Sequence, residues 1–146
     1  MVNRLKVNTI LKKLESYYLK LKEFMPITEE KLKDFKEEYA VAFLVEQIVN
    51  ECINLGNHII SERDFELPSS YKDIFKILAK EGVIQKEIVD DLVELVDIRN
   101  KIAHVYGYVT KKDLIMACEK IKVVEKFVKG IIKYLNLNFN EKEENS

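Results

Sequence analysis

Apolar side chains recur three and four residues apart along nearly the whole chain, the spacing that places them on one face of an α-helix. Four glycines and two prolines in 146 residues leave few points at which a helix must end. No segment shows the alternating pattern of a strand. We therefore predict an all-α fold, an antiparallel helical bundle of about five helices. Residues 1–137 are expected to form one domain, followed by a polar C-terminal tail over residues 138–146.

Residues suited to helix ends separate the predicted helices. Ser70 and Thr110 are each followed three residues later by an aspartate, the pattern of a capping box. Gly82 and Gly107 are suited to the position just after a helix. These limits predict five helices. The first runs through residues 10–21 and stops near a Met-Pro pair at 25–26, and the second runs from 28 to about 61. The third runs from 70 to 82, the fourth from 88 towards 106, and the fifth from 110 through 131.

The second predicted helix carries two apolar stripes. A helix that is apolar on two sides packs on two sides, either centrally in a bundle or also against a second chain. Because an apolar face over residues 88–98 also leads directly into the polar group at residues 99–106, we predict a homodimer built on the second and fourth helices. The stripes consist of Val41, Leu44, Val45, Ile48, Cys52, Leu55, Gly56 and Ile59, and of Ala42, Val49, Ile53 and Ile60.

Composition excludes several classes of protein. Since 24 Lys and Arg residues oppose 25 Asp and Glu, a globally basic nucleic-acid binder is not indicated, although residues 99–133 hold nine basic and three acidic side chains. No apolar run suggests a membrane span or a secretory signal, so a cytoplasmic location is expected. Cys52 and Cys118 lie in apolar segments without CxxC spacing and are expected to be reduced core residues. No metal-ligand spacing is present, and no cofactor is expected.

The densest group of reactive side chains lies at the end of the fourth predicted helix. Asn100 and His104 are four residues apart and share one face of the predicted helix. Arg99 directly precedes Asn100, and Tyr106 lies seven residues after Arg99. A guanidinium binds a phosphate and stays charged, whereas an imidazole moves a proton near neutral pH. Attack of a ribose 2′-OH on its own phosphodiester needs a fixed positive charge at the phosphate and a group that transfers a proton, and it needs no metal.

The pattern Arg99-Asn100-x-x-x-His104-x-Tyr106 resembles the RNxxxHxY motif of HEPN-domain proteins, specifically of the HepT-like toxins. In that family the motif follows one helix and precedes a final long helix, as expected here. The resemblance covers nearly the whole chain, because the long second helix, the connection after it and the short third helix also look like the family's layout.

The resemblance implies a metal-independent endoribonuclease that acts on RNA as the toxin of a type VII toxin–antitoxin pair. Such toxins are homodimers in which the two motifs meet in a cleft. The implied partner is an MntA-like nucleotidyltransferase antitoxin, which silences the toxin by attaching AMP to the motif tyrosine. Transferred residue by residue, Arg99 and His104 are catalytic, Asn100 supports them, and Tyr106 is the modified residue.

The motif residues also have purely structural explanations. Arg99 could form an ion pair with Asp97 or Glu94. In an otherwise apolar neighbourhood, His104 could be a hydrogen-bonded packing residue, and Tyr106 could be an amphipathic residue at the edge of the core.

Other polar residues favour structural interpretations. On the second predicted helix, His58 is expected to be buried and hydrogen-bonded, and Asn57 could either support a site or cap a turn. Glu46 and Glu51 are expected to be solvated or paired with lysines, and the lysines of the last helix are expected to form a solvated face.

Two other functions remain open on the sequence alone. The first is a non-catalytic nucleotide- or substrate-binding subunit of a minimal nucleotidyltransferase, in which Arg99 holds a phosphate and His104 orients it. The second is an interaction protein with no site. The intact pair of Arg99 and His104 favours the enzyme, because a protein that only binds has no need of both.

Overall fold

The computed structural model describes residues 2–104 and 108–136. Over these residues the chain is helical and contains no strand, which confirms the predicted all-α class. None of the described helices is both long and apolar enough to cross a membrane. The elements are α1 (Arg4–Lys22), α2 (Glu29–Leu32), α3 (Phe35–Glu62), α4 (Tyr71–Lys80), a 3-10 turn η1 (Lys86–Ile88), α5 (Val89–Ala103), α6 (Lys111–Lys120) and α7 (Val123–Leu135).

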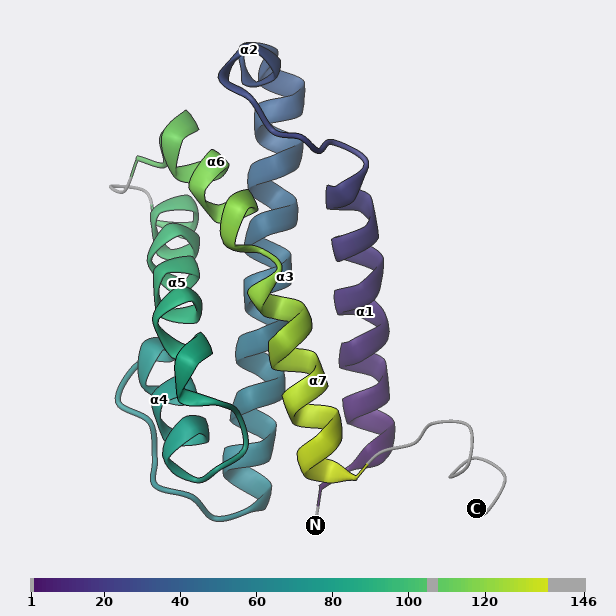
Figure 1. Cartoon of the computed structure of the whole chain (residues 1–146), viewed down its shortest axis with the longest axis vertical. Helices are drawn as coiled ribbons and strands as arrows, with labels where there is room; N and C mark the ends of the chain where they lie inside the picture. The colour runs from purple at the N-terminus through teal and green to yellow at the C-terminus, as the bar shows by residue number, and fades with distance from the viewer. Residues whose placement is uncertain (1, 105–107, 137–146) are drawn as a thin grey trace.

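The long helix α3 is the centre of the bundle (Figure 1). Helix α1 runs antiparallel along one side of it, and α4, α5 and α6 pack on other sides. The apolar faces of these helices meet in a single cluster of buried side chains. This arrangement leaves one long face of α3 between α1 and the α4–α5 pair with half-buried and exposed side chains.

Both apolar stripes of α3 are buried within the chain itself. Val41, Ile48 and Ile59 of the first stripe are fully buried, and Val49 and Ile60 of the second are nearly so. Four apolar residues of α5 are buried in the same way: Leu92, Leu95, Val96 and Ile98. The prediction that α3 packs on two sides is confirmed, but its neighbours belong to the same chain. These stripes therefore give no support to the predicted homodimer.

Three helix limits differ from the predictions. The predicted second helix is two helices, because the Asp34 side chain accepts a hydrogen bond from the Lys36 N–H and caps a new start. The predicted last helix is also divided, into α6 and α7, where backbone bonds such as Val124 N–H to Ile121 O span three residues and tighten the turn. Helix α5 ends at Ala103 instead of continuing towards residue 106.

The predicted caps are largely confirmed. Thr110 and Asp113 form a complete capping box at the start of α6. Ser70 caps α4 by accepting from the Asp73 N–H, but the Asp73 carboxylate bonds the backbone N–H and hydroxyl of Ser69 instead of returning to Ser70. This network fixes the connection that carries Ser69 and Ser70 to the N-terminus of α4.

The remaining sequence predictions on the core are confirmed. Cys52 and Cys118 are free and buried. Burial raises the pKa of the Cys118 thiol to about 12, so the reactive thiolate is disfavoured at neutral pH. The predicted tail over residues 138–146 lies outside the described residues, and its boundary stays a prediction.

Candidate functional site

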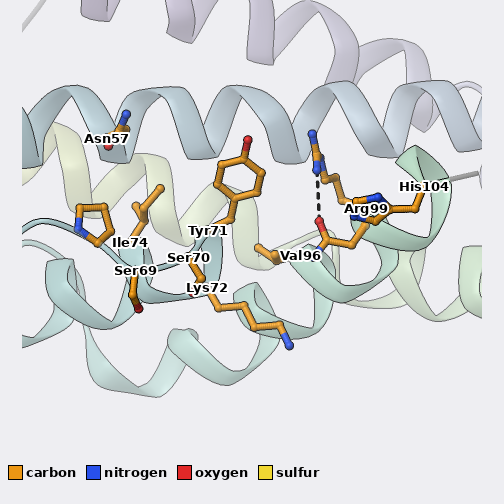
Figure 2. Close-up of a pocket in the computed structure, with 11 residues that line it drawn as sticks. Asn57, Ser69, Ser70, Tyr71, Lys72, Ile74, Val96, Arg99 and His104 are labelled. Carbon is orange, nitrogen blue, oxygen red and sulfur yellow. Dashed lines mark hydrogen bonds between the residues drawn. The ribbon is translucent and has the colours of Figure 1, made fainter. Parts of the chain in front are cut away.

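An open cleft of about 710 Å³ lies where α3, α4 and α5 meet. Arg99 and Asn100 of α5 line it together with His104, and Asn57 contributes from α3. The opposite wall is the segment 68–72, which leads into the first turn of α4 (Figure 2). The described residues of the predicted site are thus brought together in one cavity.

Neutral groups hold the Arg99 side chain, which points towards α3 (Figure 2). Its Nε–H donates to Asn50 Oδ1 at 2.7 Å, and its Nη1 donates to Asn100 Oδ1 at 3.1 Å. The guanidinium carbon lies 5.0 Å from the centre of the Tyr71 ring, within the range of a cation–π interaction. Residues from α3, α4 and α5 therefore fix one guanidinium.

The acidic residues near Arg99 in the sequence pair with lysines. Asp97 forms an ion pair with Lys72, and Glu94 forms one with Lys120 at 2.9 Å. Among the residues that the structure describes, no carboxylate lies within ion-pair distance of Arg99. The alternative that Arg99 pairs with Asp97 or Glu94 is therefore wrong, and its positive charge is oriented without being neutralised.

His104 ends α5 in an exposed position. Its backbone is extended, with φ −91° and ψ 137°, while its N–H still donates to the Asn100 carbonyl at 3.0 Å. The chain therefore leaves the helix at His104, four residues after Asn100. Its side chain is exposed at the cleft, which contradicts the alternative of a buried packing histidine.

Tyr106, the predicted site of modification, lies outside the described residues. The seven-residue spacing from Arg99 to Tyr106 would place both on nearly the same side only of a helix that continues to Tyr106, and α5 ends at Ala103. The structural alternatives for Tyr106 also stay open.

A second polar groove of about 670 Å³ lies between α1 and α3 and shares Asn57 with the first. It contains His58, which is 7% exposed and whose Nε2 accepts a hydrogen bond from the Asn3 N–H at 3.2 Å. Burial lowers the pKa of His58, and the nearby charge of Lys6 lowers it further. The expectation of a buried, hydrogen-bonded histidine is confirmed.

Glu51 contradicts its prediction. It is 7% exposed instead of solvated, and no lysine pairs with it among the described residues. One carboxylate oxygen accepts from the Asn54 amide at 3.3 Å, while Oε2 is buried without a hydrogen-bond partner. Asn57, by contrast, is exposed and lines both clefts, so it belongs to the walls of the site instead of capping a turn.

The basic stretch of residues 99–133 is partly neutralised by local ion pairs. Lys101 pairs with Asp113 at 3.2 Å, and Lys120 pairs with Asp91 and Glu94. The remaining lysines of α7 are exposed, as expected for a solvated face: Lys126, Lys129 and Lys133. Within the described ranges, no three His, Cys, Asp or Glu side chains are grouped as a metal site requires.

Sequence reasoning missed Asn50, which holds Arg99, and two residues that line the cleft, Tyr71 and Lys72. Asn50 lies 49 residues from Arg99, and its only sequence signal is a position on the same face of α3 as Asn57. Tyr71 and Lys72 line the cleft from the first turn of α4, directly after the connection whose layout resembles that of the family. No local sequence pattern links these residues to Arg99, because they lie on other helices.

A family model described as ribonuclease HepT-like matches residues 14–131. That range includes α3, α4 and α5 and every described residue of the cleft. The chain belongs to the ribonuclease HepT-like family.

One curated relative is the mRNA nuclease HepT of Shewanella oneidensis, with 30% identity over 74 residues. The match covers 51% of this chain and 56% of that protein, so the chain spans little more than half of the relative's length. This similarity supports the family assignment. The nuclease activity in the relative's name describes the relative.

Solved structures show the same fold at low sequence identity. A tri-AMPylated Shewanella oneidensis HEPN toxin in complex with MNT antitoxin has a TM-score of 0.79 and 20% identity, over 88% of this chain and 97% of that one. YutE from Bacillus subtilis, described as a cytosolic protein of unknown function, has a TM-score of 0.79 and 24% identity, over 92% and 91%. The predicted HEPN-like bundle is thereby confirmed.

Proposed function

We propose that this HepT-like protein is an endoribonuclease that cleaves RNA without a metal ion. The ribose 2′-oxygen attacks the adjacent phosphorus, the bond from phosphorus to the 5′-oxygen breaks, and the products are a 2′,3′-cyclic phosphate and a 5′-hydroxyl. Arg99 stabilises the negative charge that develops on the phosphoryl oxygens, and His104 acts as general base or acid. Asn100 supports both, since its side chain bonds Arg99 and its carbonyl accepts from the His104 N–H.

The observation that carries this proposal is the shared cleft of Arg99 and His104. The cleft is open to solvent and holds a guanidinium whose charge no described carboxylate neutralises. A structural arginine is usually paired with an acid, whereas a phosphate-binding arginine needs its charge free. An exposed imidazole beside such a cation is suited to proton transfer on a phosphodiester.

The test is cleavage of 5′-labelled RNA by the purified protein in EDTA. Wild type is expected to cleave, with products that end in a 2′,3′-cyclic phosphate, and Arg99→Ala is expected to reduce the rate by about 10²–10⁴. Arg63→Ala is the matched control, because Arg63 packs over Tyr134, away from the cleft. Loss of wild-type cleavage in EDTA would contradict metal independence. Binding of RNA without cleavage would favour the non-catalytic nucleotide- or substrate-binding subunit.

A homodimer is also part of the proposal, on a surface other than the apolar stripes. One face of α3, the α3 stripe, has no charged residue although 34% of the chain is charged. The stripe begins with exposed aromatic rings and continues with amides, which both donate and accept hydrogen bonds and are therefore self-complementary. It consists of Tyr39, Phe43, Gln47, Asn50, Asn54, Asn57 and Ser61, none of which is buried.

A second copy suits this stripe because the stripe is continuous with the cleft. Asn50 holds Arg99, and Asn57 lines the cavity. An antiparallel pairing of two α3 helices about Asn50 would set Phe43 of one copy opposite Asn57 of the other and bring the two clefts together.

Sedimentation equilibrium tests the dimer against the monomer mass of 17.2 kDa. Wild type is expected at twice this mass at micromolar concentration, and Phe43→Glu is expected to shift it to the monomer. Leu19→Glu, an equally exposed apolar residue on α1, is the control and should stay dimeric. A wild-type monomer would contradict the proposal.

The biological role that we propose is that of the toxin in a type VII toxin–antitoxin pair. A HEPN toxin of the same fold is described as tri-AMPylated and in complex with MNT antitoxin, which supports a cognate MntA-like nucleotidyltransferase as the partner here. AMP attached to Tyr106, two residues after His104, would add a negative phosphate close to Arg99 and fill the cleft.

Intact-mass spectrometry after co-expression with that nucleotidyltransferase tests the modification. Wild type is expected to gain AMP-sized increments and to lose cleavage, whereas Tyr106→Phe should keep cleavage and escape silencing. Equal increments on both proteins, or full cleavage by modified wild type, would show that Tyr106 is not the switch.

A further inference from the structure

The helical neighbours of Arg99 leave it without a charged partner. The residues three and four positions before it, Val96 and Leu95, are buried and apolar. Those three and four positions after it, Ile102 and Ala103, are apolar as well. Any group that orients the guanidinium must therefore come from elsewhere in the fold or from Asn100.

The groups that do so are electrically neutral. The Asn50 amide oxygen occupies Nε–H, the Asn100 amide oxygen occupies one Nη1–H, and the Tyr71 ring lies against the guanidinium carbon. Within the described part of the chain no other group accepts from Arg99, so three of its five N–H donors stay available for a substrate. A carboxylate in place of Asn50 would bond Nε–H more strongly, yet it would cancel the charge that attracts an anion.

We propose that Asn50 and Tyr71 are positioning residues that orient Arg99 for a phosphodiester while leaving its positive charge uncancelled, an inference that rests on the proposed ribonuclease function. The side chains that orient Arg99 must be uncharged as well as correctly shaped. An isosteric acid at position 50 should therefore damage the site more than a truncation does, which a purely structural role does not predict.

The experiment measures binding of a 2′-O-methyl RNA oligonucleotide, which resists cleavage, by fluorescence anisotropy over a series of salt concentrations. Asn50→Asp keeps the shape and the acceptor and adds one negative charge beside Nε. We expect its affinity to fall about tenfold or more, and the slope of log K against log salt to decrease by about 0.7, as for one lost phosphate contact. Asn50→Ala should weaken binding less, and the thermal stability of Asn50→Asp should equal or exceed that of wild type.

Gln85→Glu is the matched control for added charge, because it also exchanges an amide for a carboxylate. Gln85 is exposed, precedes η1, and lies outside both the cleft and the α3 stripe. Its salt slope and affinity should stay near those of wild type, and sedimentation of each variant shows whether the oligomeric state is kept. At position 71, Tyr71→Phe should bind within about threefold of wild type and Tyr71→Leu about tenfold more weakly, because only the leucine removes the ring.

Two outcomes separate this inference from the proposed function. If Arg99→Ala binds the RNA as wild type does, the ribonuclease proposal fails and the positioning roles fail with it. If Arg99→Ala weakens binding but Asn50→Asp keeps the affinity and salt slope of wild type, only the positioning inference is overturned. Stronger damage from Asn50→Ala than from Asn50→Asp would also overturn it.

Discussion

The two histidines of this chain lie in neighbouring polar clefts that share Asn57, and they differ in what surrounds them. His104 ends a helix, is exposed, and lines the cleft of a guanidinium with an available charge. His58 is buried in a helix interior, and its Nε2 already accepts the Asn3 N–H. The comparison shows that histidine chemistry depends on access and on a free nitrogen, and both are settled by position in the fold.

The carboxylates of the two clefts differ in the same way. At the first cleft, Asp97 is paired with Lys72 at the surface and leaves the guanidinium charge free. In the second, Glu51 is buried, and one of its oxygens has no hydrogen-bond partner among the residues that the structure describes. A buried acid without full hydrogen bonding costs stability, so the second groove carries an electrostatic cost that the first avoids.

The largest expected effect separates the two histidines by activity. We expect His104→Ala to lower the rate of RNA cleavage by about 10²–10⁴, the usual range for a general acid or base. His58→Gln should cleave within about threefold of wild type, since His58 lies in the other groove. Rates are measured well below the melting temperature of each variant, with circular dichroism as the check on folding. Similar losses of cleavage rate in both variants would contradict a functional difference between the two clefts.

A smaller effect concerns the stability of the second groove. We expect Glu51→Met to raise the free energy of unfolding by about 1 kcal/mol, because it removes a buried oxygen without a partner and keeps the length of the side chain. Urea unfolding followed by circular dichroism measures this change. Glu46→Met, at a half-buried position of the same helix, is the control and should stay within about 0.5 kcal/mol. A loss of stability in Glu51→Met would show that the carboxylate has a stabilising partner.

The smallest expected effect is on the pH dependence of stability. The pKa of His58 is lowered from 6.5 in the folded state, chiefly by burial and next by Lys6, while Glu62 opposes this shift. The unfolded chain therefore binds the proton more readily, and stability from this group is complete above pH 6.5 and is lost as the pH falls below it. Melting temperatures from pH 8 to pH 5 should fall more for wild type than for His58→Gln. Parallel curves would contradict the assignment.

Much of the fold was predictable because helical periodicity is a local property. The spacing of apolar residues identified which faces of α3 and α5 are buried, and Thr110 and Ser70 marked helix starts. The breaks before Phe35 and near Ile121 were missed, because the apolar pattern continues across them while the backbone bonds do not.

The candidate site was predictable only in part. Arg99, Asn100 and His104 are close in sequence, so their shared location followed from helical spacing. Asn50 and Tyr71 come from two other helices, and no local pattern ties them to Arg99. The same limit applies to Glu51, for which the sequence predicts a solvated or lysine-paired side chain and which is buried against α1.

The sequence by itself determined the helical class, the capped helix starts, the faces that form the core and the motif to which we assign the chemistry. Each of these depends on residues within a few turns of one another, where the geometry of a helix fixes the distances. Only the tertiary structure decided which charges are neutralised, which histidine is accessible and which amide and ring hold Arg99. Those outcomes depend on contacts between distant helices, and packing of the whole core selects them.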